Sequence, residues 1–148
     1  MKKKKLILAM ITDLFKLRTR YGEVDKMGYV YHVNYVTYCH QARNELLRKL
    51  GLDEIILEDK QVILPVISFD IKYKKPAHFD DLISIKTTIK EMPKVRFSFE
   101  FEIRNEHDVL LNTAKSTVVF VDSESRLPMS IPSFIENILK TKFKSEAS

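Results

Sequence analysis

Four segments in which apolar and polar residues alternate dominate the second half of this chain. They span residues 67–73, 83–89 and 97–103, and the last ends with "STVVFVD". Such alternation is typical of strands with one buried face. The connections between them, such as "EMPKV" and "RNEHDV", leave no room for crossover helices. The sequence therefore predicts an antiparallel sheet.

One strand and one long helix precede these segments. Alternation from Asp13 to Tyr21 predicts a half-buried strand. Asn34 is a favourable N-cap for a helix that runs to about Leu50, and Gly51 is a typical C-terminal stop. The apolar residues of this helix cover more than one narrow stripe, which indicates a helix embedded in the core rather than lying on its rim.

We therefore expect an α+β fold, in which a strongly twisted antiparallel sheet of about five strands wraps a long central helix. A last amphipathic helix is predicted to start at Pro132 and to cover about residues 132–144. One helix cannot cover so wide a sheet, so strand edges and remaining apolar surface should meet another subunit. The expected state is a homo-oligomer, with a dimer as its minimum.

Length and composition indicate one soluble domain of 148 residues. No apolar run approaches the roughly 20 residues of a membrane span. The apolar stretch after Lys2–Lys5 lacks a cleavage site of small residues, so we interpret residues 1–11 as a basic N-terminal extension rather than a signal peptide. Cys39 is the only cysteine, which excludes a disulfide within the chain and suits a reducing cytoplasm.

The net charge of +5 says little about partners. Lys2 to Lys5 supply four of these charges, which leaves 21 basic against 20 acidic residues in the rest of the chain. A basic tail is usually solvated, so we expect no nucleic-acid partner. The spacing of Asp25, His32 and His40 matches no metal motif, so we expect no metal site.

The segment "RYGEVDKMGYVYHVNY", residues 20–35, holds the residues best suited to chemistry. Gly28 can adopt the backbone conformations that a sharp strand-to-helix connection needs. The helix that follows directs free N–H groups and positive dipole charge at this turn, where an oxyanion is stabilised. Asp25 could attack a carbonyl or activate water there. A carboxylate with oxyanion donors is suited to acyl transfer or hydrolysis.

Structural roles remain open for the same residues. Asp25 could cap the turn or complement the helix dipole. His32 could be a satisfied structural histidine, and Glu23 a solvent-facing charge at a strand end. Tyr31 and Tyr35 could be core aromatic residues with paired hydroxyl groups.

The segment resembles the active-site signature of hotdog-fold acyl-CoA thioesterases of the 4-hydroxybenzoyl-CoA thioesterase type, including relatives associated with the Tol-Pal system. The residues that carry the resemblance, in the same order, are Tyr21, Glu23, Asp25, Gly28, Val30, Tyr31, His32 and Tyr35. It continues along "QARNELLRKLG" and "YKKPAHFDDLISI" and so covers most of the chain, but only residues 20–51 are specific.

The resemblance implies a hotdog fold and hydrolysis of acyl-CoA thioesters, with no cofactor beyond the coenzyme A of the substrate. It implies that Asp25 is the catalytic nucleophile or general base. The backbone N–H near His32 would polarise the thioester carbonyl, and the His32 side chain would position substrate or water. Lys94 and Arg96 would meet the phosphates of coenzyme A, with an ordinary solvated turn as the alternative.

Gly28, Tyr31 and Tyr35 complete the expected substrate site, and the resemblance implies a tetramer. Two residues depart from the family pattern. Glu23 stands where many relatives have Asp, and His40 stands where close relatives usually carry Glu, on the helix near the site. A hotdog hydratase needs a different sequence around its histidine. A non-catalytic hotdog protein that binds acyl groups or scaffolds an envelope complex remains the alternative to the enzyme.

Overall fold

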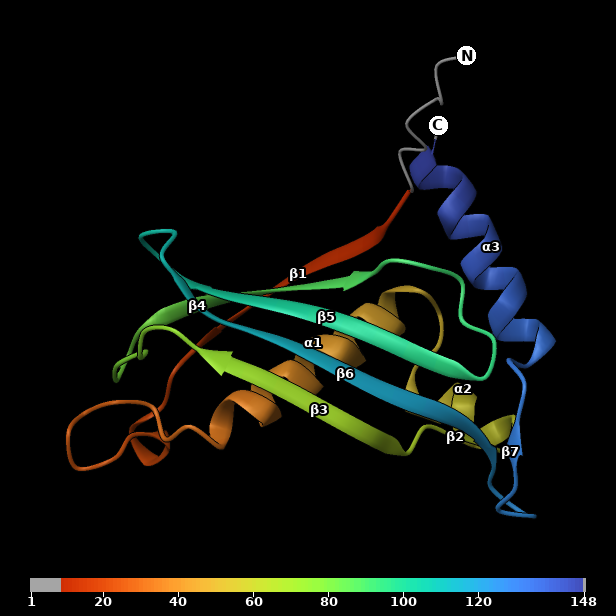
Figure 1. Ribbon diagram of the computed structural model, residues 1–148, viewed down its shortest axis with the longest axis horizontal. Coiled ribbons are helices and arrows are strands. Elements are labelled where there is room, and N and C mark those ends of the chain that lie inside the picture. The colour runs from red at the N-terminus through yellow and green to blue at the C-terminus, as the bar shows by residue number, and fades with distance from the viewer. Residues whose placement is uncertain (1–8, 148) are drawn as a thin grey trace.

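The computed structural model describes residues 9–147. Its main body is an antiparallel sheet in which the five long strands lie in the order β1-β4-β5-β6-β3 (Figure 1). The bounds of the long strands are β1 Ile11–Arg18, β3 Val66–Tyr73, β4 Leu82–Ile89, β5 Arg96–Asn105 and β6 Leu110–Asp122. Two short strands pair with the end of β6, namely β2 (Val62–Ile63) and β7 (Pro128–Met129). The predicted antiparallel sheet is confirmed.

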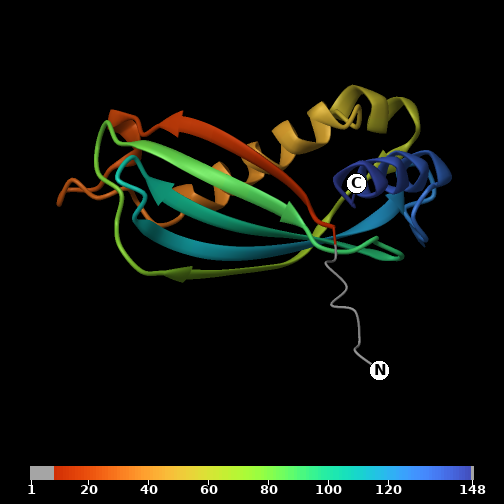
Figure 2. The ribbon, with the colours of Figure 1, turned by 90° about the horizontal axis from the view of Figure 1, so that it is seen from above.

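Helix α1 (Asn34–Lys49) lies along one face of this sheet, as Figure 2 shows. The side chains that it buries include Tyr38, Cys39, Ala42 and Leu46, and the sheet residues of the same core include Phe97, Phe99, Ile85 and Ile103. These sheet residues come from alternate positions of β4 and β5, as the period of two requires. The predicted long helix over the sheet is confirmed, but it is not embedded on all sides, because Val36, Thr37, His40 and Gln41 on its outer side are exposed.

The two ends of α1 differ in how well the sequence predicted them. Gly51 has a φ of +79°. The N–H of Leu52 donates to the carbonyl of Leu47 at 2.7 Å, and that of Gly51 donates to Arg48 at 3.0 Å. These two bonds form the Schellman motif that a C-terminal glycine supports. At the other end the prediction was wrong, because Val33 occupies the N-cap position and Asn34 lies within the helix.

The first strand ends earlier than predicted. At Thr19 the ladder breaks: its N–H still donates to the carbonyl of Asp81, but the N–H of Asp81 donates to the Thr19 hydroxyl oxygen, and that hydroxyl donates to the carbonyl of His78. Residues Tyr21–Glu23 then form a 3-10 turn. Tyr21 is therefore not on the buried face but is 80% exposed, and its ring contacts the edge of Phe79. These bonds to the loop before β4 end the strand at Arg18.

Two further helices lie beside the end of the sheet at which β1 begins (Figure 1). α2 (Glu54–Asp59) was not predicted, and the Asp53 carboxylate caps it by accepting from the N–H of Ile56 at 3.0 Å. α3 (Ser133–Ala147) follows Pro132 and runs slightly beyond the expected end. It packs through Ile135 and Leu139, which are buried in the main core.

The predicted N-terminal extension, residues 1–11, lies mostly outside the described residues. Its last residue, Ile11, is wrongly placed in that extension, because it begins β1 and is fully buried. Within residues 9–147 no helix is long and apolar enough to cross a membrane.

The face of the sheet that α1 does not cover is polar. The expectation that remaining apolar surface of the sheet would meet another subunit is therefore wrong for this face. The residues of β5 that alternate with its buried phenylalanines are Ser98, Glu100 and Glu102, and Lys86 on β4 is exposed beside them. A face of this kind can remain solvated. Strand β3 is different, because within the described residues only β6 pairs with it and its second edge is free.

Candidate active site

Residues 24–30 form a tight hairpin between the 3-10 turn and α1. Val24 and Val30 form an isolated antiparallel bridge. The N–H of Asp25 donates to the carbonyl of Tyr29 at 2.7 Å, and that of Gly28 donates to the carbonyl of Asp25 at 3.0 Å. Gly28 has a φ of +79°, a conformation that residues with a Cβ rarely adopt. The glycine therefore lets the chain reverse at this point, as the sequence predicted.

The hairpin orients the Asp25 carboxylate through one of its oxygens. Oδ1 accepts from the N–H of Met27 at 2.9 Å and from that of Tyr29 at 3.2 Å. Within residues 9–147 no group donates to Oδ2, and the side chain is exposed. The turn-capping role is thus real, but it occupies one oxygen only. The other oxygen remains available to a substrate or a water molecule.

Glu23 fixes the start of the hairpin and is not the solvent-facing charge that we considered. Its side chain is 15% exposed. Oε1 accepts from the N–H of Arg20 at 2.7 Å and from the buried Tyr38 hydroxyl at 2.8 Å. Burial by itself raises the pKa of Glu23, but these hydrogen bonds and the Arg20 charge outweigh it and hold the pKa below its usual value. Glu23 is therefore an ionised anchor between the turn and α1.

The N-terminal end of α1 carries two free backbone N–H groups. Asn34 donates its backbone N–H to the carbonyl of Tyr31 and its side-chain amide to the carbonyl of Glu23, at 2.9 and 2.8 Å. The N–H groups of His32 and Val33 donate to no group in the described part of the chain. Free donors at the positive end of a helix dipole stabilise an anion or a developing oxyanion.

His32 is an exposed residue at the same helix end. Its ring contacts those of Tyr31 and Tyr73, with centroids 4.7 and 6.0 Å away. Its backbone carbonyl accepts from the Tyr73 hydroxyl at 3.0 Å. Neither ring nitrogen bonds to another residue in the described range, so His32 is not a satisfied structural histidine. Tyr73 was missed as a site residue, although it opens the "YKKPAHFDDLISI" segment.

The two tyrosines expected to contact substrate occupy different environments. Tyr31 is half exposed beside His32. Tyr35 is 2% exposed, and its hydroxyl accepts from the N–H of Ala77 at 2.9 Å. Burial raises the pKa of Tyr35, so the group stays neutral. Tyr35 is a core residue that ties α1 to the loop after β3, as one of the two interpretations of the sequence proposed.

The family model described as the thioesterase-like superfamily matches residues 19–139, which include the hairpin and all of α1. The chain belongs to this superfamily. The acyl-CoA thioester hydrolase YbgC of Escherichia coli O6:H1 is 34% identical over 128 residues, which cover 85% of this chain and 96% of that protein. The putative acyl-CoA thioesterase YneP of Bacillus subtilis is 33% identical over 114 residues, or 77% of this chain and 83% of that protein.

Solved structures agree with this assignment. A DHNA-CoA thioesterase from Staphylococcus aureus has a TM-score of 0.83 and 26% identity, and the match covers 92% of this chain and 91% of that one. The predicted hotdog fold is confirmed, and the chain is a thioesterase.

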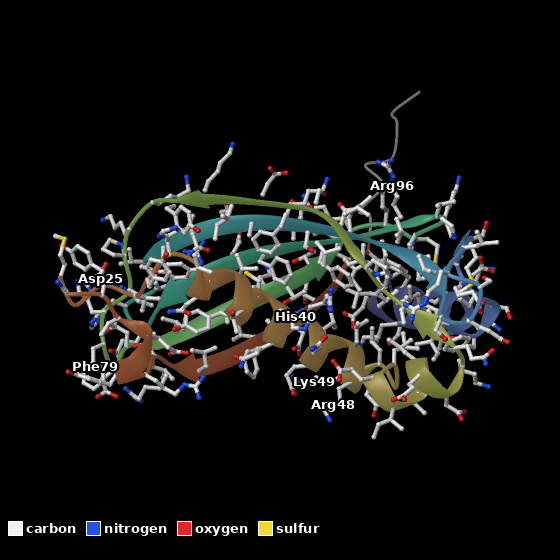
Figure 3. The ribbon with its side chains drawn as sticks, turned by 90° about the horizontal axis from the view of Figure 1, so that it is seen from below. Asp25, His40, Arg48, Lys49, Phe79 and Arg96 are labelled. Carbon is white, nitrogen blue, oxygen red and sulfur yellow. The ribbon has the colours of Figure 1, made fainter. Side chains whose placement is uncertain are left out.

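In this thioesterase Lys94 and Arg96 do not lie beside Asp25 of the same chain. Asp25 follows the end of β1, where Arg18 pairs with Leu82. Arg96 begins β5 beyond the opposite end of β4, and Figure 3 shows Arg96 and Asp25 toward opposite ends of the molecule.

Other cations lie at the Asp25 end. Lys26 follows Asp25 directly, and Lys74 and Lys75 follow Tyr73 at the end of β3. All three side chains are exposed, and within the described residues none is in an ion pair. Sequence reasoning missed them because they have no motif of their own.

The two remaining residues of interest on α1 are Cys39 and His40. Burial raises the pKa of the Cys39 thiol to about 12, which excludes a reactive thiolate. His40 is exposed and lies midway along α1, away from Asp25 of the same chain (Figure 3). Its Nε2 lies 3.2 Å from the side-chain amide of Asn44. Burial, followed by the charge of Arg43, lowers the pKa of His40.

Proposed function

We propose that this thioesterase hydrolyses acyl-CoA thioesters to a free acid and coenzyme A, with Asp25 as its catalytic carboxylate. The observation that carries the proposal is the Asp25 side chain, which is held through Oδ1 and open at Oδ2. The names of the Escherichia coli and Staphylococcus aureus relatives support a CoA thioester as the substrate.

Two routes use the same geometry. As a general base, Asp25 takes a proton from water while the water oxygen attacks the thioester carbon. As a nucleophile, it attacks that carbon itself and forms an anhydride, which water then hydrolyses. In both routes the C–S bond breaks and the sulfur of coenzyme A leaves as a thiolate that takes up a proton.

The carbonyl oxygen gains negative charge in both routes, and the free N–H groups of His32 and Val33 are suited to receive it. We assign His32 a second role, in which its exposed imidazole positions substrate or water. Gly28 contributes through the shape of the hairpin, and Tyr31 is the expected aromatic contact of the substrate. Tyr35 supports the site from the core rather than touching the acyl group.

The proposed active form is a homo-oligomer, with a dimer as its minimum and a tetramer as the state that the family resemblance implies. The free edge of β3 supports the dimer, because Val66, Ile67 and Tyr73 are each about half exposed along it. A second copy that pairs with this edge would satisfy its backbone groups. The single cysteine supports a cytoplasmic location.

The phosphates of coenzyme A have two candidate binding sites. Lys74 and Lys75 lie at the Asp25 end of the same chain, whereas Lys94 and Arg96 could serve only the site of another copy. Exposed cations of this kind bind ground and transition states about equally and therefore affect KM rather than kcat.

A pair of double variants distinguishes the two sites. The two double variants are Lys74→Ala/Lys75→Ala and Lys94→Ala/Arg96→Ala. The variant that removes the cations bound to the phosphates should raise KM about tenfold, because each contact contributes up to about 1 kcal/mol. The effect should shrink with added salt and disappear on a thioester that lacks the nucleotide. The other double variant is the control. Equal losses on both substrates would contradict a phosphate role for either pair.

The central test is Asp25→Asn with a panel of acyl-CoAs, measured by release of the free thiol. The amide keeps the shape of the carboxylate but is a poor base and nucleophile, so kcat should fall about 100-fold or more. His32→Ala should cost less, because the backbone N–H groups remain. Turnover near that of the wild type in a folded Asp25→Asn would leave Asp25 with its capping role only. A wild-type chain inactive on every acyl-CoA would favour the non-catalytic acyl-binding protein.

A further inference from the structure

Arg43 is a buried charge that forms no ion pair within the described residues. It lies on α1 between His40 and Arg48, both labelled in Figure 3, and is 8% exposed. Within residues 9–147 no carboxylate oxygen lies within 4 Å of its guanidinium. In the part of the chain that the structure describes, its Nε has no hydrogen-bond partner. The hydrogen bond that it makes within the described range, from an Nη atom to the side-chain oxygen of Asn44, is long at 3.4 Å.

A buried guanidinium in this state is energetically costly. Burial lowers the pKa of Arg43, and the negative charge of Glu54 offsets this only in part. Arginine nonetheless stays protonated in proteins, so the charge cannot be removed by loss of a proton. A buried charge is expected to be paired. Arg43 thus has an unmet requirement for an anion.

Arg43 lines a groove between the second half of α1, α2 and β2, which we call the Arg43 pocket. Its volume is about 530 Å³, in the range of small-molecule sites. Its apolar lining is formed by Leu47, Leu52, Leu57, Val62, Ile63 and Leu64. An occupant that uses the whole pocket therefore needs a hydrocarbon part as well as a negative charge.

The acidic residues at the rim limit the charge of that occupant. Asp53 is engaged as the N-cap of α2, and the rim cation Arg48 is paired with Glu45 at 3.4 Å. Glu54 and Glu58 are exposed at the mouth. Two carboxylates at the entrance repel a dianion such as phosphate more strongly than a monoanion.

We propose that the Arg43 pocket binds a monocarboxylate with an apolar tail, whose carboxylate pairs with the guanidinium of Arg43. Planar guanidinium and carboxylate groups match in a bidentate pair, and the hydrocarbon tail lies against the leucines. The pocket is lined by the second half of α1, whereas His32 and the Asp25 hairpin lie at the N-terminal end of that helix. The two sites are therefore separate. The proposal does not depend on hydrolytic activity.

Calorimetric titration of the full chain with octanoate, 1-octanol and inorganic phosphate tests this. We expect octanoate to bind at least about tenfold more tightly than either, as a hydrogen-bonded charge pair requires. Arg43→Met keeps the volume and removes the charge, so octanoate should then bind no better than octanol. Arg48→Met removes a paired cation from the same rim and should change little. Failure of octanoate to bind, or equal binding by the Arg43→Met variant, would overturn the proposal.

A second variant tests the proposal without removing Arg43. His40 precedes Arg43 by three residues, so the two side chains are neighbours on the helix, and His40→Glu places a carboxylate beside the guanidinium. We expect this variant to lose the preference for octanoate over octanol while keeping its thermal stability. An unchanged preference would contradict the pairing. If Arg43→Met instead alters the sedimentation mass, Arg43 pairs with a carboxylate of a second copy, and the ligand proposal is wrong.

Discussion

Replacement of Glu23 by alanine should destabilise the chain through one buried hydroxyl group. The Tyr38 hydroxyl donates to Glu23 Oε1 at 2.8 Å, and Tyr38 is 1% exposed. Without Glu23 this hydroxyl has no acceptor, which costs about 2 kcal/mol. Loss of the bond from the Arg20 N–H costs about 1 kcal/mol more. The Arg20 guanidinium is 74% exposed, so its ion pair contributes almost nothing.

The expected loss is therefore about 3 kcal/mol, or a fall of about 6–12 °C in Tm for a chain of this size. Urea unfolding followed by circular dichroism measures it. The control is Tyr38→Phe, which removes the hydroxyl instead of stranding it, and in that background Glu23→Ala should cost about 1 kcal/mol. An equal cost in both backgrounds would refute the role of the hydroxyl.

The pH dependence of the same anchor has a definite sign. The pKa of Glu23 is lower in the folded state than its ordinary value of 4.5. The unfolded chain therefore binds the proton more readily, and stability from the ionised group is present in full above about pH 4.5. It is lost as the pH falls below that value and through the folded pKa. The stability difference between the wild type and Glu23→Gln should shrink over this acid range only.

Two further predictions concern the hairpin and the sheet edge. Gly28→Ala should lower the free energy of unfolding by about 1 kcal/mol, because φ is +79° there, although no atom lies within 4 Å of the added Cβ. The control is Gly22→Ala, at a position without positive φ. Equal effects of the two substitutions in urea unfolding would contradict the backbone argument. Ile67→Lys should reduce the sedimentation mass by disrupting pairing through β3, whereas Leu14→Lys, which is equally exposed on β1, should not. A wild-type chain that sediments as a monomer at micromolar concentration would refute the oligomer.

The central helix and the long strands were predictable because their signals are local. Alternation along β5 directly places Phe97, Phe99 and Phe101 on one face. The end of α1 at Gly51 was predictable because glycine readily adopts positive φ, and the Schellman motif that it completes needs no contact with a distant residue. α2 was missed although Asp53 before Glu54 is a usable N-cap signal, since the helix is too short to show a period.

The errors in the site region arise from contacts between distant segments. Tyr21 fits the period of the first strand, but the hydrogen bonds of the Thr19 hydroxyl, which accepts from the N–H of Asp81 and donates to the carbonyl of His78, end that strand before Tyr21 is reached. Glu23 resembles a surface charge until α1 brings the Tyr38 hydroxyl to it. The Asp25 hairpin was predictable in its parts, because Gly28 and the Asx-type turn act within a few residues.

The position of Lys94 and Arg96 shows why a correct list of strands does not locate a site. The β4–β5 turn lies at the C-terminal end of β4. Where this end lies relative to the Asp25 hairpin depends on which strand pairs with β4. That neighbour is β1, distant in the chain, and the pairing of Ile11 with Ile89 carries the turn to the end where β1 begins. The Asp25 hairpin follows the other end of β1. Strand order, not turn chemistry, separates these cations from Asp25 of the same chain, and only another copy of the chain could bring them together.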